Sequence, residues 1–287
     1  MQRILLLALV VILIGGLLAG CGQDQPSNQE GQNDGAKQGE KQDEILSGTI
    51  TIAGSTSVQP LSEELRKVFE EKHPDVTIYV QGGGSSAGVK AAANGTADIG
   101  AASRKLKESE KEYGLTVITI ARDGIAIAVH PSNPVEGMSL EEVRKVYTGE
   151  ITNWKQLGGK DAPIEVVTRE EGSGTRGAFE ELVMEDSKIT DNAIVQPSNG
   201  AVRTTVASSE NAIGFISVGF LNDEVKGLKI DGVEPTAENI VAGKYPLFRP
   251  FNYLVKGEPK GIVKAYIDFV LSEEGQKIVA KDYIPVK

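Results

Sequence analysis

The residues best suited to chemistry in this sequence are hydroxyls and glycines that stand where predicted strands give way to predicted helices. Three such junctions occur: AGSTS with Ser55, Thr56 and Ser57, GGGSSAG with Ser85 and Ser86, and REEGSGT with Arg169, Ser173 and Thr175. A helix N-terminus presents backbone N–H groups without intrahelical partners, and its dipole favours negative charge. Glycine lets the backbone approach a ligand closely. This combination suits a small oxyanion.

Each junction alone is explained by helix capping, because Ser and Thr are common N-cap residues. The three together carry more weight, since ligands of open α/β folds bind where strand ends meet helix starts. Arg169 favours the same interpretation, because a guanidinium can grip two oxygens of one tetrahedral anion through parallel N–H bonds. Either Glu170 or Glu171 could fix the orientation of that side chain. We therefore predict an oxyanion site with Arg169 as its charge clamp.

Asp98, in the segment GTADIGAAS, is the carboxylate that we predict to face the ligand. It stands just before an apolar run, where it could lie near the ligand-facing end of a sheet. A carboxylate there repels a fully ionised anion but accepts a hydrogen from one that keeps a proton, as phosphate does at neutral pH and sulfate does not. Such an acceptor would discriminate strongly between the two anions. The alternative role for Asp98 is an ordinary turn or capping carboxylate.

The elements that must position these residues follow an alternating pattern from residue 48 onward. Short β-rich runs alternate with amphipathic stretches, which predicts an α/β fold with largely parallel sheets covered by helices. The last helix is predicted over residues 261–281. Two strand-rich stretches, residues 115–128 and 246–256, could carry the chain between two lobes. The predicted lobes are residues 48–123 with 249–287, and residues 124–248.

The N-terminal residues predict export and a lipid anchor. Residues 1–20 contain one cation, Arg3, followed by an apolar run, which is typical of a signal peptide. The run ends Leu-Ala-Gly before Cys21, a lipobox in which the thiol receives a diacylglyceryl group. Residues 21–47 are rich in polar and charged side chains and predict a flexible tether. The alternative is a transmembrane helix with a chance cysteine.

Composition excludes several classes of function. The net charge of −10 disfavours binding to nucleic acid. Cysteine and histidine do not cluster at ligand spacing, so no metal site is predicted. The sequence has no G-x-x-x-x-G-K-[ST] loop, so any ATP hydrolysis must come from a separate protein.

Four segments, taken in order, resemble one known family. They are AGSTSVQPL, QGGGSSAGVKAAANGTADIGAASR, LEEVRKVYTGEITNW and TREEGSGTRGAF. The sequence from residue 48 to residue 287 is similar to the periplasmic phosphate-binding proteins of bacterial high-affinity phosphate ABC transporters. The resemblance implies a two-lobed type II periplasmic-binding-protein fold, with a hinge of two crossing strands, that closes over phosphate without a cofactor.

The resemblance also implies roles for individual residues. The matching ligand positions are Thr56, the backbone N–H of Ser57, Ser85, Asp98, Arg169, Ser173, the N–H of Gly174, and Thr175. Glu171 matches the acidic residue that pairs with the arginine. One departure is Ser57-Val58, where some members have Phe-Pro, so the resemblance leaves contacts by the Ser57 hydroxyl or by Ser55 open and unassigned. The implied partners are a two-subunit permease and separate ATPase subunits. The lipobox suits a Gram-positive organism, in which the receptor is tethered to the outer face of the cell membrane.

Two alternatives stay open at the level of sequence. One is a receptor for another oxyanion, such as sulfate or molybdate. The other is a serine hydrolase, because Gly84-Ser85-Ser86-Ala87-Gly88 matches G-x-S-x-G. Such an enzyme needs a histidine late in the chain, and no histidine follows His130. We therefore expect a binding protein and not an enzyme.

Overall fold

Two long strands run side by side through the middle of the fold. They are β4 (Leu115–Val129) and β11 (Phe248–Lys256), which pair antiparallel from Gly124↔Phe248 to Leu115↔Lys256. The computed structural model describes residues 46–287. The predicted signal peptide, Cys21 and all but the end of the predicted tether lie outside the described residues.

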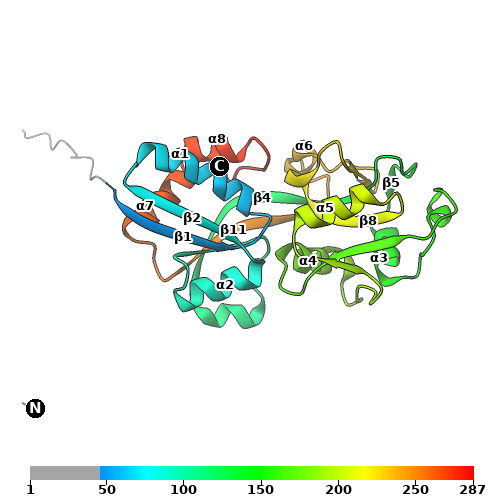
Figure 1. Cartoon of the computed structure of the whole chain (residues 1–287), viewed down its shortest axis with the longest axis horizontal. Coiled ribbons are helices and arrows are strands. Elements are labelled where there is room, and N and C mark those ends of the chain that lie inside the picture. Colours follow the sequence, from blue (N-terminus) through cyan, green and yellow to red (C-terminus); the bar gives the residue numbers. More distant parts are fainter. Residues whose placement is uncertain (1–45) are drawn as a thin grey trace, which may run out of the picture. The chain divides into compact units, whose positions relative to one another are not determined.

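One mixed sheet contains most of the strands, in the order β2-β1-β3-β11-β4-β8-β6-β7, and β9 also pairs with β4. A second, two-stranded sheet joins β10 to β5. The remaining strands are β1 (Gly48–Gly54), β2 (Val76–Gly82), β3 (Ile99–Ala102), β5 (Gly137–Met138), β6 (Glu165–Arg169), β7 (Ile194–Gln196), β8 (Ala212–Ser217), β9 (Lys226–Gly227) and β10 (Lys229–Ile230). Helices cover this sheet at both ends (Figure 1).

The α-helices are α1 (Gln59–Lys72), α2 (Ser85–Asn94), α3 (Leu140–Thr148), α4 (Gly174–Phe179), α5 (Asn199–Ser208), α6 (Ala237–Val241), α7 (Gly261–Val270) and α8 (Glu273–Val279). Shorter helical segments are η1 (Glu108–Tyr113), η2 (Trp154–Leu157), η3 (Glu180–Met184) and η4 (Val218–Phe220). The η3 segment is a π-helix that directly continues α4.

Two of the sequence expectations about elements are corrected here. Parallel pairing occurs at the ends of the sheet, but the middle is antiparallel, because β4 and β11 run in opposite directions between the two ends. The helix predicted over residues 261–281 is two helices. Ser272 separates them because its hydroxyl caps the N–H of Gly275 and begins α8.

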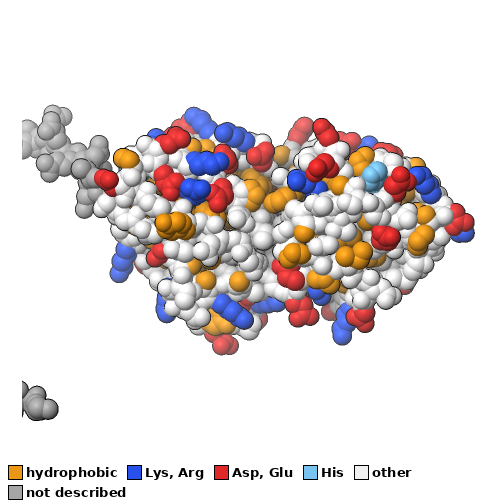
Figure 2. Space-filling model, in the orientation of Figure 1, with side chains coloured by type: hydrophobic (Ala, Val, Ile, Leu, Met, Phe, Trp, Pro, Cys, Tyr) orange, Lys and Arg blue, Asp and Glu red, His pale blue; other side chains and the backbone are white. Residues whose placement is uncertain are grey.

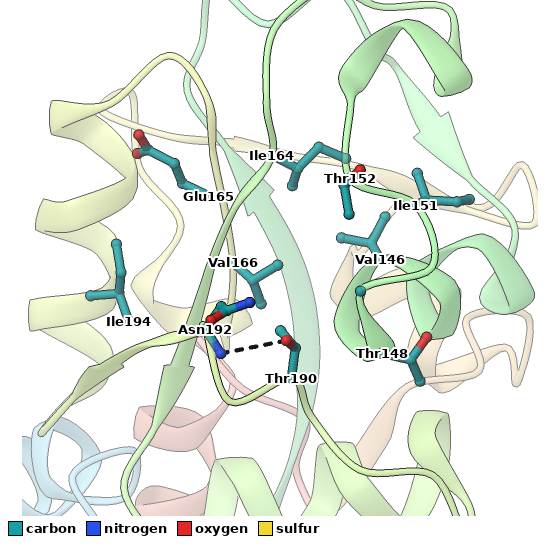
Figure 3. A pocket seen from close by; sticks show the side chains of 11 residues that line it. Val146, Thr148, Ile151, Thr152, Ile164, Glu165, Val166, Thr190, Asn192 and Ile194 are labelled. Atoms are coloured by element: carbon teal, nitrogen blue, oxygen red, sulfur yellow. Dashed lines mark hydrogen bonds between the residues drawn. The ribbon is translucent and has the colours of Figure 1, made fainter.

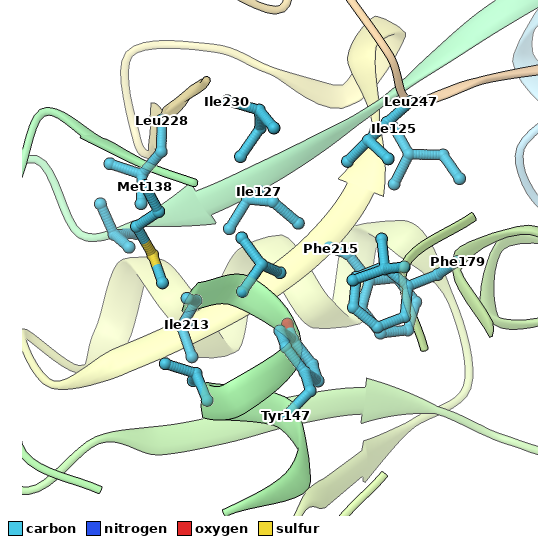
Figure 4. Close-up of a cluster of buried hydrophobic side chains, with 14 of the residues drawn as sticks. Ile125, Ile127, Met138, Tyr147, Phe179, Ile213, Phe215, Leu228, Ile230 and Leu247 are labelled. Carbon is cyan, nitrogen blue, oxygen red and sulfur yellow. The ribbon is translucent and has the colours of Figure 1, made fainter. Parts of the chain in front are cut away.

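Two main hydrophobic cores hold the two ends of the sheet. The first core packs α1, α7 and α8 on β1, β2 and β11, and α1 contributes Leu61, Leu65 and Phe69 from one face. The second core packs α3 and α4 on β4 and β8 and includes Tyr147 (Figure 4). Trp154 belongs to the same core. Each core is thus rich enough in buried apolar side chains to hold its own end of the sheet.

Aromatic stacking in the second core fixes the position of α4. The ring of Phe179, at the end of α4, stacks on Phe215 of β8 with centroids 4.2 Å apart, and Tyr147 lies 4.6 Å from Phe179. Such pairs add to the stability that burial alone provides. Because the C-terminal end of α4 is anchored in this core, its N-terminal end is held at the edge of the sheet.

A close backbone approach fixes α2 in the same way at the other end. A Cβ atom on Gly88 would lie 2.6 Å from the carbonyl oxygen of Ala53 and 2.7 Å from that of Ala101. Only glycine fits at this distance, so α2 can lie directly on β1 and β3. The start of α2 is thereby placed beside the ends of those strands.

Among residues 46–287, no helix combines the length and apolar character that a membrane crossing requires.

Candidate anion-binding site

Arg169, the last residue of β6, is the most deeply buried cation of the predicted site, with 1 % of its surface exposed. The edge of its guanidinium formed by Nε and Nη2 is hydrogen-bonded to other protein groups. Nε donates to Glu170 at 2.9 Å and to the carbonyl of Gln196 at 3.1 Å, and Nη2 donates to Glu170 at 2.9 Å and to the carbonyl of Pro197 at 3.2 Å. These bonds fix the plane of the side chain.

The other edge of the Arg169 guanidinium is unsatisfied. Nη1 is buried and has no hydrogen-bond partner among the described residues, while Nη2 also donates to Thr56 Oγ1 at 3.3 Å. A buried cationic N–H without an acceptor costs free energy, so such groups in native proteins call for an explanation. A bound anion would supply the missing acceptor.

The acidic residue that orients Arg169 is Glu170 and not Glu171. The two Glu170 oxygens each accept one guanidinium N–H, in the bidentate arrangement typical of a strong arginine–carboxylate pair. The side chain of Glu171 is exposed and lies with Ser173 and Arg176 at the rim of a hollow of about 200 Å³. The resemblance had placed this role one residue too late.

The start of α4 carries the three predicted residues Ser173, Gly174 and Thr175. The Ser173 hydroxyl caps the helix by accepting from Arg176 N at 3.2 Å. The Thr175 hydroxyl lies 2.9 Å from the Ser57 hydroxyl, which belongs to the loop between β1 and α1. Residues 118 positions apart in the chain therefore meet at this point.

Ser85, the first residue of α2, joins the same cluster. Its Oγ accepts from Ser103 N at 3.0 Å and lies 3.4 Å from Ser103 Oγ. A Cβ atom added to Gly174 would overlap Ser85 Oγ and lie 2.5 Å from Ser103 Oγ. The starts of α2 and α4 thus approach each other closely enough for one small ligand to contact both.

Ser57 enters the cluster through its hydroxyl and not through its backbone. Its N–H already donates to Ser55 Oγ at 3.2 Å, within the loop that begins α1. The Ser57 hydroxyl accepts from Asn199 Nδ2 at 2.8 Å. The Ser57 N–H predicted as a ligand thus has a protein acceptor, and the hydroxyl of Ser57 is the group that joins the cluster.

Asp98 does not join the cluster, and the prediction that it faces the ligand is wrong. It precedes β3, at the end of that strand opposite to Ser103, and its exposed carboxylate accepts from Thr51 N at 2.8 Å. The parallel register pairs Ile99 with Ile52, so Asp98 lies beside the middle of β1 and away from its end. Its backbone N–H also donates to the Thr51 carbonyl at 3.0 Å, so Asp98 holds the start of β3 beside β1.

Sequence reasoning missed a second buried arginine. Arg249 of β11 and Asp123 of β4 are direct cross-strand partners, and both Nε and Nη2 of Arg249 donate to Asp123 Oδ2, at 3.0 and 2.9 Å. Nη2 also donates to Ser57 Oγ at 3.0 Å, and Nη1 donates to Ser103 Oγ at 3.3 Å. The sequence does place both charges within apolar runs, Asp123 after Arg122 in β4 and Arg249 near the start of β11.

The Arg249–Asp123 pair links elements from both cores. Ser217 of β8 donates its hydroxyl hydrogen to Asp123 Oδ1 at 2.8 Å, and Ser217 N donates to Asn199 Oδ1 at 3.1 Å. Burial raises the pKa of Asp123 and lowers the pKa of Arg249, and the attraction between the two charges opposes both shifts. The positive charge of Arg169 further lowers the pKa of Arg249, so the two guanidinia repel each other across the cluster.

Other features of the described residues do not compete with this cluster. A hollow of about 320 Å³ lies between α3, β6 and β7, and its lining is threonine, asparagine and apolar side chains with Glu165 (Figure 3). It shares no residue with the cluster and contains no cation.

Residues 46–287 also contain no group of His, Cys, Asp and Glu that could hold a metal ion. On the visible face, acidic and basic side chains are interspersed (Figure 2), so the cluster must attract an anion by local groups.

Ser86, the central serine of the G-x-S-x-G match, is bound to an arginine and not to a histidine. Ser86 Oγ accepts from Arg104 Nη2 at 3.0 Å, and Arg104 in turn forms a buried ion pair with Glu110 at 2.7 Å. His130 bonds to Ser132 within its own turn, and His73 packs on Phe69. Neither histidine is bonded to Ser86, so the described structure contains no Ser–His pair there.

The sequence matches known proteins over most of its length. A family model for the PBP superfamily domain matches residues 29–274. The phosphate-binding protein PstS of Bacillus subtilis is 35% identical over 288 aligned residues, which cover 99% of this chain and 93% of that protein. PstS of Borreliella burgdorferi is 30% identical and covers 80% of this chain and 87% of its own length.

The chain belongs to the PstS family of phosphate-binding proteins. Solved structures agree. A protein from Clostridium perfringens, assigned as a phosphate ABC transporter substrate-binding protein and crystallised with bound phosphate, is 48% identical with a TM-score of 0.82, covering 84% of this chain and all of its own. An ABC-type phosphate transport receptor from Vibrio cholerae is 40% identical with a TM-score of 0.70, covering 83% of this chain and all of its own.

Membership of the family settles two of the expectations. The two-lobed α/β fold with a hinge of two crossing strands is confirmed by these neighbours. The expectation of a binding protein is also confirmed, because the family consists of substrate-binding receptors and not of enzymes.

Proposed function

We propose that this chain is an extracytoplasmic receptor that binds inorganic phosphate and delivers it to an ABC permease for import. The observation that carries the proposal is the Arg169 guanidinium, buried with 1 % exposure, whose Nη1 has no partner among residues 46–287. The names of the relatives from Bacillus subtilis and Borreliella burgdorferi support phosphate as the ligand.

The ligand would be held by donors from both ends of the sheet. We propose as its contacts the guanidinium of Arg169, the hydroxyls of Thr56, Ser85 and Thr175, and the start of α4 at Ser173 and Gly174. The Gly174 and Thr175 N–H groups lie in the first turn of α4, where no intrahelical partner exists. Binding needs no covalent chemistry, since each contact is a hydrogen bond to an anion oxygen.

Two lobes closing on phosphate would bring these donors together. We propose residues 48–123 with 249–287 as one lobe and residues 124–248 as the other, with β4 and β11 as the hinge. Contacts between the two sets support the division into facing surfaces, for example Ser86 N donating to the Gly172 carbonyl at 3.0 Å. A ligand favours closure because it makes more contacts in the closed state than in the open one.

One observation favours a second candidate, a receptor for several tetrahedral oxyanions. With Asp98 removed from the site, the nearby carboxylates are Asp123 and Glu170, and both are occupied. Asp123 already accepts from Arg249 and Ser217, and Glu170 accepts twice from Arg169. Both carboxylates are thus paired with an arginine, and neither is a dedicated acceptor for the hydrogen that distinguishes phosphate from sulfate.

Calorimetric titration of the protein produced without residues 1–21 separates these candidates. We expect tight binding of phosphate and of arsenate, which has the same shape and protonation. Rejection of sulfate and molybdate in large excess would identify a phosphate receptor, whereas equal competition by sulfate would identify the broader oxyanion receptor. A protein that binds none of the four anions would refute the proposed function.

Lipid anchoring and partners form the rest of the proposal. Cys21 would carry the lipid and hold the receptor at the cell membrane of a Gram-positive organism, since two acyl chains bind a bilayer stably. Docking on a two-subunit permease, with separate ATPase subunits, would then release phosphate. Replacement Cys21→Ser tests the anchor directly: the protein should move from the membrane fraction to the medium, and retention in the membrane would contradict it.

A further inference from the structure

We infer that Arg249 is a positioning residue of this site: it sets the direction in which the hydroxyls of Ser85 and Thr175 donate their hydrogens. The inference deepens the proposed function and rests on it. Arg249 lies at the hinge and reaches the ligand hydroxyls only through two intermediate serines, Ser57 and Ser103.

The first route runs through Ser57. A serine oxygen has two lone pairs and one hydrogen. Both lone pairs of Ser57 are used, because Arg249 Nη2 donates to it at 3.0 Å and Asn199 Nδ2 donates at 2.8 Å. The amide of Asn199 is oriented by its own oxygen, which accepts from Ser217 N.

The single hydrogen of Ser57 must therefore point to its remaining neighbour, Thr175 Oγ1 at 2.9 Å. Thr175 then acts as the acceptor in that contact, and its own hydrogen is left to donate elsewhere. Because Thr175 stands in the first turn of α4, beside Gly174, that hydrogen is available to an anion at the helix start.

The second route runs through Ser103 and has the same logic. Ser103 Oγ accepts from Ser55 Oγ at 2.8 Å and from Arg249 Nη1 at 3.3 Å, so its hydrogen is directed to Ser85 Oγ at 3.4 Å. Ser85 Oγ also accepts from Ser103 N at 3.0 Å. Both lone pairs of Ser85 are then used, and its hydrogen also remains for an anion.

One guanidinium thus orders one donor from each proposed lobe. Hydrogen bonds in a chain polarise one another, so a cation at the head of each route strengthens the donor at its end. Asp123 completes the arrangement, because it holds the Arg249 guanidinium in place with 1 % exposure on both side chains and keeps the pair neutral.

A double-mutant cycle tests the inference with phosphate titration. The paired replacement Arg249→Met with Asp123→Asn removes both charges without leaving a buried unpaired one. In the wild-type background we expect phosphate affinity to fall about thirtyfold, as two donors lose their orientation. In the background Ser57→Ala with Ser103→Ala, the same pair should change affinity less than about threefold, because both routes are already cut.

The outcomes are distinguishable. Equal losses in the two backgrounds would overturn the inference and show that Arg249 acts through the fold or by direct charge. Absence of phosphate binding by the wild-type protein would instead refute the proposed function on which the inference rests. The matched control, Arg104→Met with Glu110→Gln, removes another buried ion pair that touches neither Ser57 nor Ser103, and should leave affinity within about twofold.

A second variant guards against a failure of the paired replacement to fold. Arg249→Lys keeps a cation beside Asp123, but a single ammonium cannot serve Ser57 and Ser103 as a planar fork does. We expect a loss of about fivefold to tenfold in the wild-type background that disappears when both serines are alanine. A loss that persists in the alanine background would contradict the inference.

Discussion

The two buried arginines of the cluster, Arg169 and Arg249, differ in what surrounds them. Both guanidinia are almost wholly inaccessible, and each binds a carboxylate. Every nitrogen of Arg249 has a partner, and its carboxylate, Asp123, is 1 % exposed. Arg169 keeps Nη1 free of any described partner, and its carboxylate, Glu170, is 36 % exposed.

This difference separates a structural charge from a ligand-binding charge. A fully paired cation inside a protein has nothing left to offer a ligand, and removing it leaves its partner stranded. An arginine that has an unpaired N–H edge and a solvent-exposed counter-ion can be replaced by a neutral residue with a smaller loss of stability. We therefore expect Arg249 to matter most for stability and Arg169 most for affinity, and the predictions below test that contrast.

The largest expected effect is on the stability of Arg249→Met. Asp123 would be left buried and uncompensated, which typically costs about 3–5 kcal/mol of the unfolding free energy. Arg169→Met should cost at most about 2 kcal/mol, because Glu170 can be solvated where it lies. Urea unfolding of the two variants measures both values, and equal losses would remove the contrast.

The next effect is on the affinity of Arg169→Met for phosphate. The variant loses a charge-assisted contact worth up to about 3 kcal/mol, so the dissociation constant should rise roughly a hundredfold. The matched control is Arg144→Met on α3, whose guanidinium pairs with Glu185 away from the cluster. Titration calorimetry should find the control within about twofold of wild type. Undiminished affinity in Arg169→Met would refute the role of its free edge.

A smaller effect distinguishes the two neighbouring glutamates. Glu170→Gln weakens the bidentate hold on Arg169, and we expect phosphate affinity to fall about fivefold, or roughly 1 kcal/mol. Glu171→Gln should change it by less than about twofold, since that side chain is exposed and makes no described bond to Arg169. If Glu171→Gln proved the more damaging of the two, the orienting role would return to the residue that the resemblance indicated.

The smallest effect is expected for Asp98→Asn. An asparagine oxygen can still accept from Thr51 N, so neither stability nor phosphate affinity should change by more than about 0.5 kcal/mol. The ratio of phosphate to sulfate affinity should also match that of wild type in competition titrations. A loss of discrimination between phosphate and sulfate would restore Asp98 as the residue that selects the anion. It would contradict the position of Asp98 at the far end of β3.

Sequence alone predicted the parts of this site that depend on local chemistry. Hydroxyls and glycines at helix starts predicted where Ser85 and Thr175 would lie, because strand-to-helix junctions collect at one edge of a sheet. The alternation of elements predicted the α/β class.

The failures have one physical cause, which is pairing between distant strands. Whether Asp98 faces the ligand depends on the register of β3 against β1, and no local pattern fixes that register. The Arg249–Asp123 pair joins residues 126 positions apart and becomes visible only when β11 lies on β4. The choice between Glu170 and Glu171 depends on the turn after β6. In each case the missing information was tertiary.

A crystal structure of the protein with phosphate tests the central claim most directly. We predict a tetrahedral anion with one oxygen within hydrogen-bonding distance of Arg169 Nη1 and others near the hydroxyls of Ser85 and Thr175, with Arg249 still paired to Asp123. Phosphate bound elsewhere, with Arg169 Nη1 still lacking a partner, would contradict the account.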